Sequence, residues 1–196
     1  MTKFYISDTH FGHKRLLIEG KKLRPEFSTI EDHDNCIIEN WNRVVSDEDD
    51  VYFLGDFVCK SKNSAAYYLK QLKGHKHLIK GNHDVKKGGI VKPELMEYFE
   101  DAYDILQVKD GERLICLCHY PLAEWPQYYH GCYHFYGHIH NDTAGIVYPY
   151  MRNLKDKDGN PLAFNVGVDV IGYAPLTADQ IISNPQWQSL KERDEN

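Results

Sequence analysis

The sequence predicts an α/β protein. Short apolar runs alternate with longer segments of helical periodicity along the 196 residues, and Gly, Asp, Asn or His bound the short runs. A hydrophobic content of 42% is sufficient for one well-filled core, so we expect a single domain over residues 1–196. The last residues, 191–196, are expected to form a flexible tail.

Six short apolar runs predict the strands, and capping signals predict the helices between and after them. Ser28 and Glu31 form a capping-box pattern ahead of the longest helix, and Asn63 is the expected cap of the next. The predicted strands are 3–7, 51–54, 77–79, 114–117, 134–136 and 163–166. The predicted helices are 29–45, 64–72 and a short one that opens at Thr177. Residues 141–161 are expected to form a loop or hairpin over one face.

Composition disfavours several classes of protein. The net charge of -6 provides no basic footprint, so a long nucleic acid is a disfavoured partner. No apolar run approaches the roughly 18 residues that cross a bilayer, and no signal-peptide pattern is present, so we expect a cytoplasmic protein without a membrane partner. Five scattered cysteines argue against a disulfide framework and are expected to be buried thiols.

Side chains that can bind a metal follow five of the predicted strands. Taken singly, each is an ordinary turn or cap residue; together they place oxygen and imidazole donors where open α/β sheets form their sites, at the carboxyl ends of strands. We therefore expect one site built from five loops. In chain order the polar residues are Asp8, His10, Asp56, Asn82, His83, Asp84, His119, His138 and His140.

These blocks resemble the motifs of the calcineurin-like metallophosphoesterases. The resemblance runs from Lys3 to about Pro175 and is greatest to the small single-domain bacterial and phage members. It implies two mixed β-sheets packed as a sandwich and flanked by helices, an αββα fold. The matching motifs are Asp8-x-His10, Gly55-Asp56, Gly81-Asn82-His83-Asp84, His119 and Gly137-His138-x-His140.

The resemblance also implies a site for two divalent metal ions. Two such ions about 4 Å apart repel by on the order of 17 kcal/mol at an effective dielectric near 20, so a shared carboxylate is nearly obligatory. The mixed oxygen and nitrogen ligands suit Mn²⁺, Fe²⁺, Zn²⁺ or Ni²⁺. The implied ligands are Asp8, His10 and His140 for one ion, Asn82, His119 and His138 for the other, and Asp56 as the bridge between both.

The implied reaction is hydrolysis of a phosphoester. Metal coordination can lower the pKa of water from 15.7 towards about 7, and a bridging hydroxide would then attack phosphorus in line. His83 is expected to stay free of metal and to stabilise the developing charge or protonate the leaving group. Asp84 is expected to orient the His83 imidazole and raise its pKa. Both residues are therefore catalytic candidates.

The substrate is expected to be a small phosphoester, with a phosphodiester or nucleotide favoured over a monoester. Phe57-Val58-Cys59 after Gly55-Asp56 departs from the protein-phosphatase pattern, which disfavours phosphoproteins. Weak candidates for substrate contacts are His13, Arg15, Trp125 and Tyr128, each with an equally good structural explanation.

Two alternatives of other classes stay open at this point. One is a non-catalytic module of the same fold that binds metal or phosphate, which the complete ligand set disfavours. The other is a nuclease, which the absence of a basic stripe in the sequence disfavours. The oligomeric state is left open.

Overall fold

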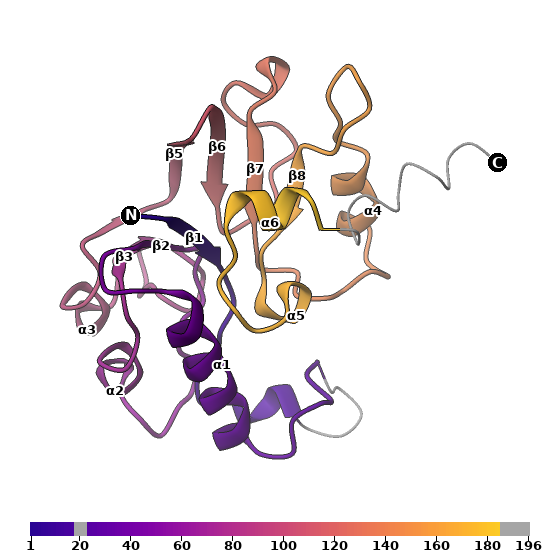
Figure 1. The fold of residues 1–196 in the computed structure, drawn as a ribbon. Coiled ribbons are helices and arrows are strands. Elements are labelled where there is room, and N and C mark those ends of the chain that lie inside the picture. The colour runs from indigo at the N-terminus through magenta and orange to yellow at the C-terminus, as the bar shows by residue number, and fades with distance from the viewer. Residues whose placement is uncertain (18–22, 185–196) are drawn as a thin grey trace.

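A computed structural model describes residues 1–17 and 23–184. The predicted tail at 191–196 lies outside the described residues. Two four-stranded sheets with flanking helices form the α/β architecture shown in Figure 1. This confirms the predicted fold class.

The first sheet is parallel, in the order β1-β2-β3-β4. In the second sheet, in the order β5-β6-β7-β8, only the β5–β6 pair is antiparallel. An antiparallel bridge between Tyr5 and Leu176 adds a neighbour of opposite direction beside β1. The strands of the first sheet are Lys3–Ile6, Asp50–Phe53, His75–Ile79 and Asp101–Tyr103. Those of the second are Ile105–Asp110, Arg113–Cys118, Tyr133–Tyr136 and Ala163–Asn165.

The helices cover the outer faces and the strand connections (Figure 1). They are α1 (Ile30–Val44), α2 (Ala65–Leu69), α3 (Pro93–Met96), α4 (Val147–Arg152), α5 (Val168–Ile171) and α6 (Ala178–Ile182). Two 3₁₀ helices, η1 and η2, cover Lys14–Leu17 and Tyr128–His130. The segment 141–161 thus contains α4 besides its small antiparallel turn at Lys155 and Pro161.

Two of the expected helix caps are displaced by one residue. Thr29, not Ser28, caps α1 by accepting from the Asp32 backbone amide, and Ser64, not Asn63, caps α2. At α6, Thr177, where the sequence predicts a helix to open, forms a capping box with Gln180. Hydroxyl and amide side chains compete for adjacent capping positions, so a pattern locates a cap only to within a residue.

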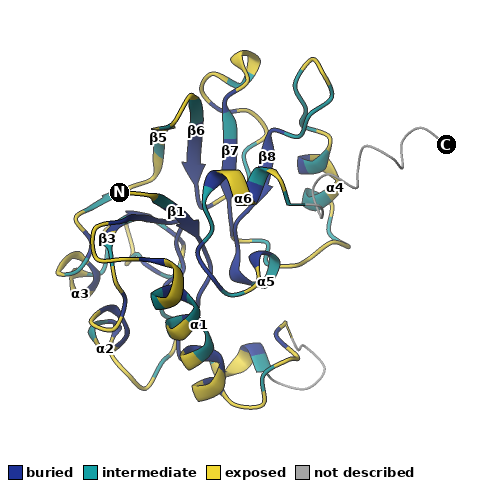
Figure 2. Ribbon diagram, viewed as in Figure 1, coloured by how far each residue is buried: buried dark blue, intermediate teal, exposed yellow. Residues whose placement is uncertain are grey.

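Alternating residues of each strand divide the core into three layers. In β1, Phe4 and Ile6 pack against the helices α1 and α2, whereas Tyr5 faces the second sheet. Phe135 of β7 lies in the layer between the sheets, and Tyr136 packs on the opposite face with Met151 of α4. Figure 2 shows the strands of both sheets largely buried and the exposed residues on the outer helices and loops. The sheets therefore form a rigid base for the loops at their edges.

Within the described ranges, no helix is both long and apolar enough to span a bilayer. The five cysteines are free thiols, of which Cys36 is half-buried and the other four are buried.

Candidate metal centre

The polar residues predicted from the strand ends come together at one edge of the two sheets. The loops after β1 and β2 run side by side, with the Asp8 amide donating to the Gly55 carbonyl at 2.9 Å and the His10 amide to the Asp56 carbonyl at 3.0 Å. Ligating atoms within 4.8 Å of one another define several overlapping groups, of which the first discussed is Asp8, His10 and His140 and the second is Asp56, His119 and His138. His10 and Asp56 also form such a group with His83, and His10 forms one with His13 and Cys59.

The first group combines the buried Asp8 and His10 with the half-buried His140, and it has unpaired polar atoms. Asp8 Oδ2 accepts from the His138 backbone amide at 2.9 Å, but Asp8 Oδ1 is buried with no hydrogen-bond partner in the described part of the chain. Both ring nitrogens of His10 are likewise buried and unpartnered among those residues. The His10 ring stacks on that of His140, with centroids 5.0 Å apart. Unpaired buried polar atoms destabilise a fold, so this arrangement calls for a cation.

A second layer of residues, absent from the sequence-based prediction, orients His140. Its Nδ1 lies 2.7 Å from Asp169 Oδ2, and this hydrogen bond raises the pKa of His140 even though burial opposes the rise. Asp169 also bonds Arg24, which is fully buried and donates to the carbonyls of Asp8 and Thr9. One signal was available in the sequence: Asp169 is a charged residue between two valines.

In the second group, a hydrogen bond to a backbone carbonyl fixes the tautomer of His119. The Nδ1 of His119 lies 2.7 Å from the Leu54 carbonyl, so it carries the proton and leaves Nε2 as the acceptor. That Nε2 is 3.2 Å from Asn82 Oδ1. The ring of His138, an exposed residue, lies 5.1 Å from the His119 ring. Asn82 thus joins the group as the prediction requires.

Asp56, a member of the second group, also reaches the first. Its Oδ1 accepts from the His83 backbone amide at 2.7 Å, which fixes the carboxylate. Its Oδ2 is 3.5 Å from His10 Nε2 and 3.7 Å from His119 Nε2, one residue from each group. A carboxylate in this position can serve two cations at once.

The electrostatics fit bound cations. Burial raises the pKa of Asp56 to about 7, and the neighbouring Asp8 carboxylate adds to the rise. Burial lowers the pKa of His10 to about 4 and also lowers that of His138, so both imidazoles are neutral at pH 7. Metal ligation needs neutral imidazoles, and a cation offsets the repulsion between two buried carboxylates. The donor set therefore fits a metal centre.

The backbone is shaped for this convergence. Five of the expected ligands have left-handed conformations, with φ between 48° and 70°: Asp8, His10, Asp56, His138 and His140. Gly81 allows a close approach, since a Cβ there would lie 2.4 Å from Asp56 Oδ1. A Cβ at Gly137 would lie 2.2 Å from Asp8 Oδ2. Both glycines thus leave room for the two central carboxylates.

The structure corrects the expected role of Asp84. Its buried carboxylate accepts from the backbone amides of Asp56 (2.7 Å), Phe57 (3.0 Å) and Gly81 (2.9 Å), and so joins the loops after β2 and β3. Asp84 therefore does not orient the His83 imidazole as expected, although its charge partly offsets the larger effect of burial, which lowers the pKa of His83. Instead, the Nδ1 of His83 faces the Cys59 sulfur at 3.4 Å, and burial lowers the pKa of His83. Its Nε2 lies 3.9 Å from Asp56 Oδ2, at the rim of the cluster.

The weak candidates for substrate contacts divide into two pairs. His13 is half-buried beside the first group, with its ring centroid 5.7 Å from that of His10. Arg15 is exposed on η1, and its charge helps to lower the pKa of His13 after the larger effect of burial. These two residues lie near the metal ligands.

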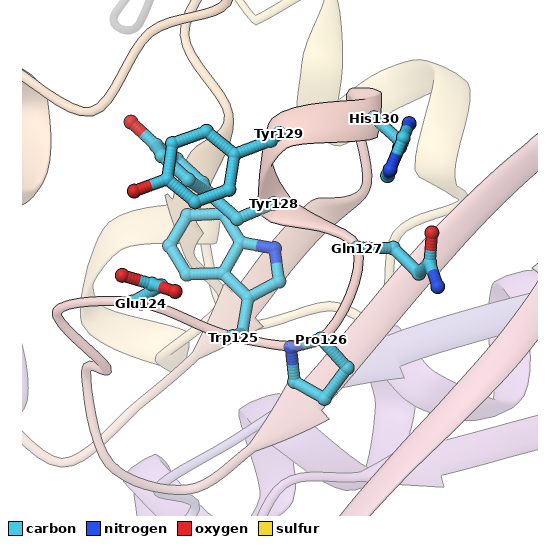
Figure 3. A pocket seen from close by; sticks show the side chains of 7 residues that line it. All are labelled: Glu124, Trp125, Pro126, Gln127, Tyr128, Tyr129 and His130. Atoms are coloured by element: carbon cyan, nitrogen blue, oxygen red, sulfur yellow. The ribbon is translucent and has the colours of Figure 1, made fainter.

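Trp125 and Tyr128 do not join the cluster. Because β6 and β7 are parallel, the connection between them returns to the start of β7, whereas His138 follows its end. Trp125 is buried, and its indole nitrogen donates to the Cys132 carbonyl at 2.8 Å. Residues 124–130 line a separate shallow hollow of about 460 Å³, shown in Figure 3, which contains no expected metal ligand. These two aromatics therefore lie in a hollow apart from the ligand cluster.

The fold and the ligand cluster together define a metal-dependent phosphoesterase. A family model described as calcineurin-like phosphoesterase matches residues 1–184, and the chain belongs to this family. The resemblance seen in the sequence motifs is thereby confirmed.

Three relatives show how far the similarity extends. An uncharacterized protein of Methanocaldococcus jannaschii is 36% identical over 186 residues, which cover 93% of this chain and 90% of that protein. The Gene 66 protein of Mycobacterium phage L5 is 36% identical over 84 residues, 41% of this chain and 39% of that protein. The crystal structure of a protein of unknown function from Aquifex aeolicus has 28% identity and a TM-score of 0.67, and covers 91% of this chain and 96% of that one.

Proposed function

We propose that this chain uses two divalent metal ions to hydrolyse small phosphoesters. Phosphodiesters or nucleotides would be preferred over monoesters. The observation that carries the proposal is the position of Asp56 Oδ2 between His10 of one ligand group and His119 of the other. The unpaired buried atoms of Asp8 and His10 support it, because they lack any other partner among the described residues.

The proposed ligands are those expected from the sequence. Asp8, His10 and His140 would hold one ion, Asn82, His119 and His138 the other, and Asp56 both. When bound, the ions would supply Lewis acidity towards the phosphoryl oxygens and a water of lowered pKa. Mn²⁺, Fe²⁺, Zn²⁺ and Ni²⁺ all suit these ligands.

The protein's own contribution is orientation. Asp169 and the Leu54 carbonyl each hold one imidazole in a single tautomer, which directs the remaining nitrogen at the cluster. The Asp84 carboxylate fixes the backbone on both sides of Asp56 and so keeps the proposed bridge in place. His83, half-buried at the rim, is the group we assign to stabilise charge on the phosphoryl oxygens or to protonate the leaving group.

Cations beside His83 support an anionic substrate. Lys92 Nζ donates to the His83 carbonyl at 2.5 Å, and Lys92 and Lys60 together line a groove of about 410 Å³. The charges of both lysines contribute to lowering the pKa of His83, after burial. Two lysines against the single carboxylate of Glu94 in this groove, on a chain of net charge -6, favour a small anion over a polyanion.

The test is hydrolysis of a phosphoester panel with Mn²⁺, Ni²⁺, Zn²⁺ or Mg²⁺ supplied in turn. The panel contains a nitrophenyl monoester, a bis-nitrophenyl diester, cyclic and linear nucleotides, a phosphopeptide and a long oligonucleotide. We expect metal-dependent turnover, fastest for the diester or a nucleotide. Turnover of the phosphopeptide or long oligonucleotide alone would contradict the proposal, and binding without turnover would indicate a non-catalytic module.

Asp56→Ala provides the matching structural test. Without a shared carboxylate the repulsion between two ions is unscreened, so the variant should lose both ions in elemental analysis of desalted protein. Asp158→Ala, in an exposed turn, is the control and should retain both. Full occupancy in Asp56→Ala would rule out the bridging role.

We also propose that residues 1–196 form one domain and that the protein works in the cytoplasm. The five free thiols support a reducing compartment.

A further inference from the structure

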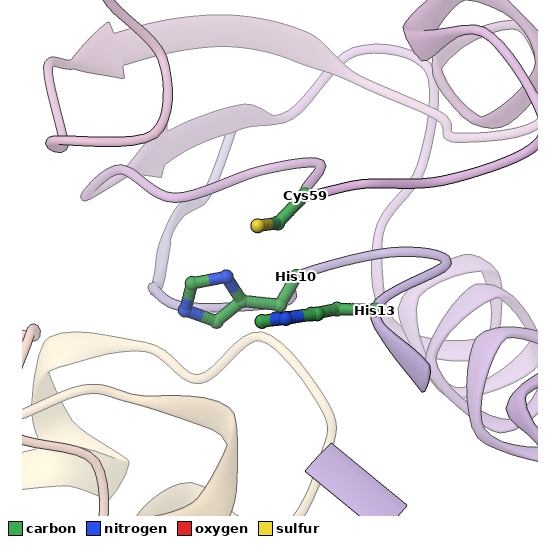
Figure 4. Close-up of side chains that lie close together, drawn as sticks. All are labelled: His10, His13 and Cys59. Carbon is green, nitrogen blue, oxygen red and sulfur yellow. The ribbon is translucent and has the colours of Figure 1, made fainter. Parts of the chain in front are cut away.

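We propose that His13, Cys59 and His10 form a third metal site, with soft ligands, that binds a thiophilic cation such as Zn²⁺ and inhibits the enzyme by removing His10 from the metal centre. The three side chains converge from two neighbouring loops, as Figure 4 shows. One ligating atom from each lies within 4.8 Å of the other two. The inhibitory part rests on the proposed function, whereas the binding site stands on its own geometry.

The loops that carry these residues are tied together by their backbones. The Phe11 amide donates to the Phe57 carbonyl at 2.9 Å, and the Cys59 amide to the Phe11 carbonyl at 3.3 Å. Gly12 packs tightly against the second loop, since a Cβ there would lie 2.1 Å from Ser61 Oγ. Two side chains from one loop and one from the other are therefore held in a fixed relationship, which a preformed site requires.

The imidazole nitrogens of this cluster lack partners. Both ring nitrogens of His13 and both of His10 are buried without a hydrogen bond to any described residue. His10 is only 2% exposed. A buried polar atom without a partner is unfavourable, and His10 can satisfy one nitrogen in the metal centre. The His13 nitrogens have no such use in that centre, so the proposed function leaves them unexplained.

The chemistry of this donor set differs from that of the metal centre. Cys59 is 4% exposed, and burial raises the pKa of its thiol, so it carries a proton until a cation binds. On binding, the sulfur–hydrogen bond is lost, its proton goes to solvent and a sulfur–metal bond forms, with no change of oxidation state. Thiolate and imidazole ligands favour Zn²⁺ over Mn²⁺ or Mg²⁺. The soft site would thus distinguish among cations that the metal centre accepts.

Sharing of His10 couples the soft site to catalysis. A neutral imidazole has one acceptor nitrogen and can serve only one ion at a time. His10 Nε2 lies 3.7 Å from Asp8 Oδ1 and 3.5 Å from Asp56 Oδ2, within reach of the proposed catalytic ions. Filling the soft site therefore competes with the ion held by Asp8, His10 and His140. Excess Zn²⁺ should then inhibit an enzyme that is active with Mn²⁺.

The direct test is titration of the metal-free protein with Co²⁺. None of the proposed catalytic ligands is a cysteine, so a thiolate-to-cobalt charge-transfer band in the near ultraviolet reports the soft site alone. We expect the band in the wild type beyond two equivalents of Co²⁺ and its loss in Cys59→Ser and in His13→Gln. Cys36→Ser, which changes a half-buried thiol on α1, is the control and should keep the band.

The second test is Zn²⁺ inhibition of the Mn²⁺-loaded enzyme. Because the Cys59 sulfur also faces His83 Nδ1, each variant is compared with its own turnover in Mn²⁺ without zinc. Cys59→Ser should require roughly 10-fold or more Zn²⁺ for half inhibition, at least the effect of losing an outer-shell partner of a metal. Circular dichroism checks the fold of each variant, and His13→Gln provides the cobalt test if Cys59→Ser does not fold. Absence of the thiolate band in the wild type, or a band that survives both substitutions, overturns the proposal. Neither result bears on turnover measured in the absence of zinc. The proposed function would therefore stand in both cases.

Discussion

Asp169 fixes the ring of His140: its Oδ2 lies 2.7 Å from His140 Nδ1, and its Oδ1 lies 2.5 Å from Arg24 Nε. A carboxylate that accepts a hydrogen bond from one ring N–H of a histidine leaves the other ring nitrogen to face a metal. The guanidinium in turn donates to the carbonyl of Asp8, so one buried arginine connects two proposed ligands of the same ion.

Asp169→Asn should therefore weaken metal binding by roughly 10–100-fold, the usual effect of removing such a partner. The affected ion is the one proposed for Asp8, His10 and His140, and titration with Mn²⁺ at low concentration should show one tight and one weakened site. Asp179→Asn, a surface carboxylate paired with Arg113, is the control. Two unchanged affinities in Asp169→Asn would show that the hydrogen bond does not orient a ligand.

His83→Gln should separate catalysis from metal binding. If His83 acts on the substrate, the variant keeps both ions and its melting temperature but loses roughly 10²–10⁴-fold in kcat. A leaving group that needs a proton, such as a ribose hydroxyl, should show the larger loss, and nitrophenolate the smaller one. Equal losses for all leaving groups, with metal retained, would assign His83 to charge stabilisation. Loss of an ion would make it a ligand.

Asp84→Asn should show a different pattern from His83→Gln. The carboxylate accepts three backbone hydrogen bonds, and an asparagine would place an NH₂ group against amide donors. We expect a loss of about 1–3 kcal/mol in the free energy of unfolding and weaker metal binding through Asp56. Denaturant unfolding and metal titration measure both. A loss of kcat that depends on the leaving group, at unchanged stability, would instead restore a direct role beside His83.

His134 should make the metal-free protein sensitive to acid. It is buried in the second sheet, its Nε2 accepts from the Leu122 amide, and burial lowers its pKa from 6.5 to about 4. Between these values the unfolded chain binds a proton that the folded chain does not. The stability that the neutral ring contributes is therefore complete above pH 6.5 and is lost as the pH falls towards 4, by on the order of 3 kcal/mol.

The measurement is the free energy of unfolding of chelator-treated protein between pH 7 and pH 4.5. His134→Gln, which cannot titrate, should show a shallower decline than the wild type, whatever its stability at pH 7. His75→Gln, at an exposed histidine, should retain the wild-type slope. Parallel curves for wild type and His134→Gln would contradict the prediction.

Strands with continuous apolar runs could be predicted from the sequence, including β1 and β8 at sheet edges, whereas the exposed edge strands β4 and β5 could not. All four residues of β2 are buried, and so its run 51–54 was evident. In β5 only Val108 is buried, and β4 has no buried residue, so neither shows a hydrophobic pattern. Edge strands gain their order from backbone pairing with a neighbour, which is a tertiary property.

Some residues of the site could likewise be predicted from the sequence, and others could not. The grouping of Asp8, His10 and Asp56 follows from their positions at strand ends, where parallel topology forces convergence. The partner of Asp84 could not be foreseen, because a carboxylate next to a histidine accepts equally well from backbone amides of another loop. Arg24 was missed for a related reason: it lies outside every strand, and burial of its guanidinium depends on acceptors from α5 and the β1 loop.

The left-handed conformations of the five ligand residues also bear on protein engineering. A non-glycine residue in this region costs roughly 1–2 kcal/mol relative to the usual right-handed backbone, and glycine avoids most of that penalty. Laboratory selection for heat resistance without a requirement for turnover should therefore enrich glycine at Asp8, His10, Asp56, His138 and His140. Consensus or computational stabilisation of this chain would therefore have to hold these positions constant to keep the proposed ligands.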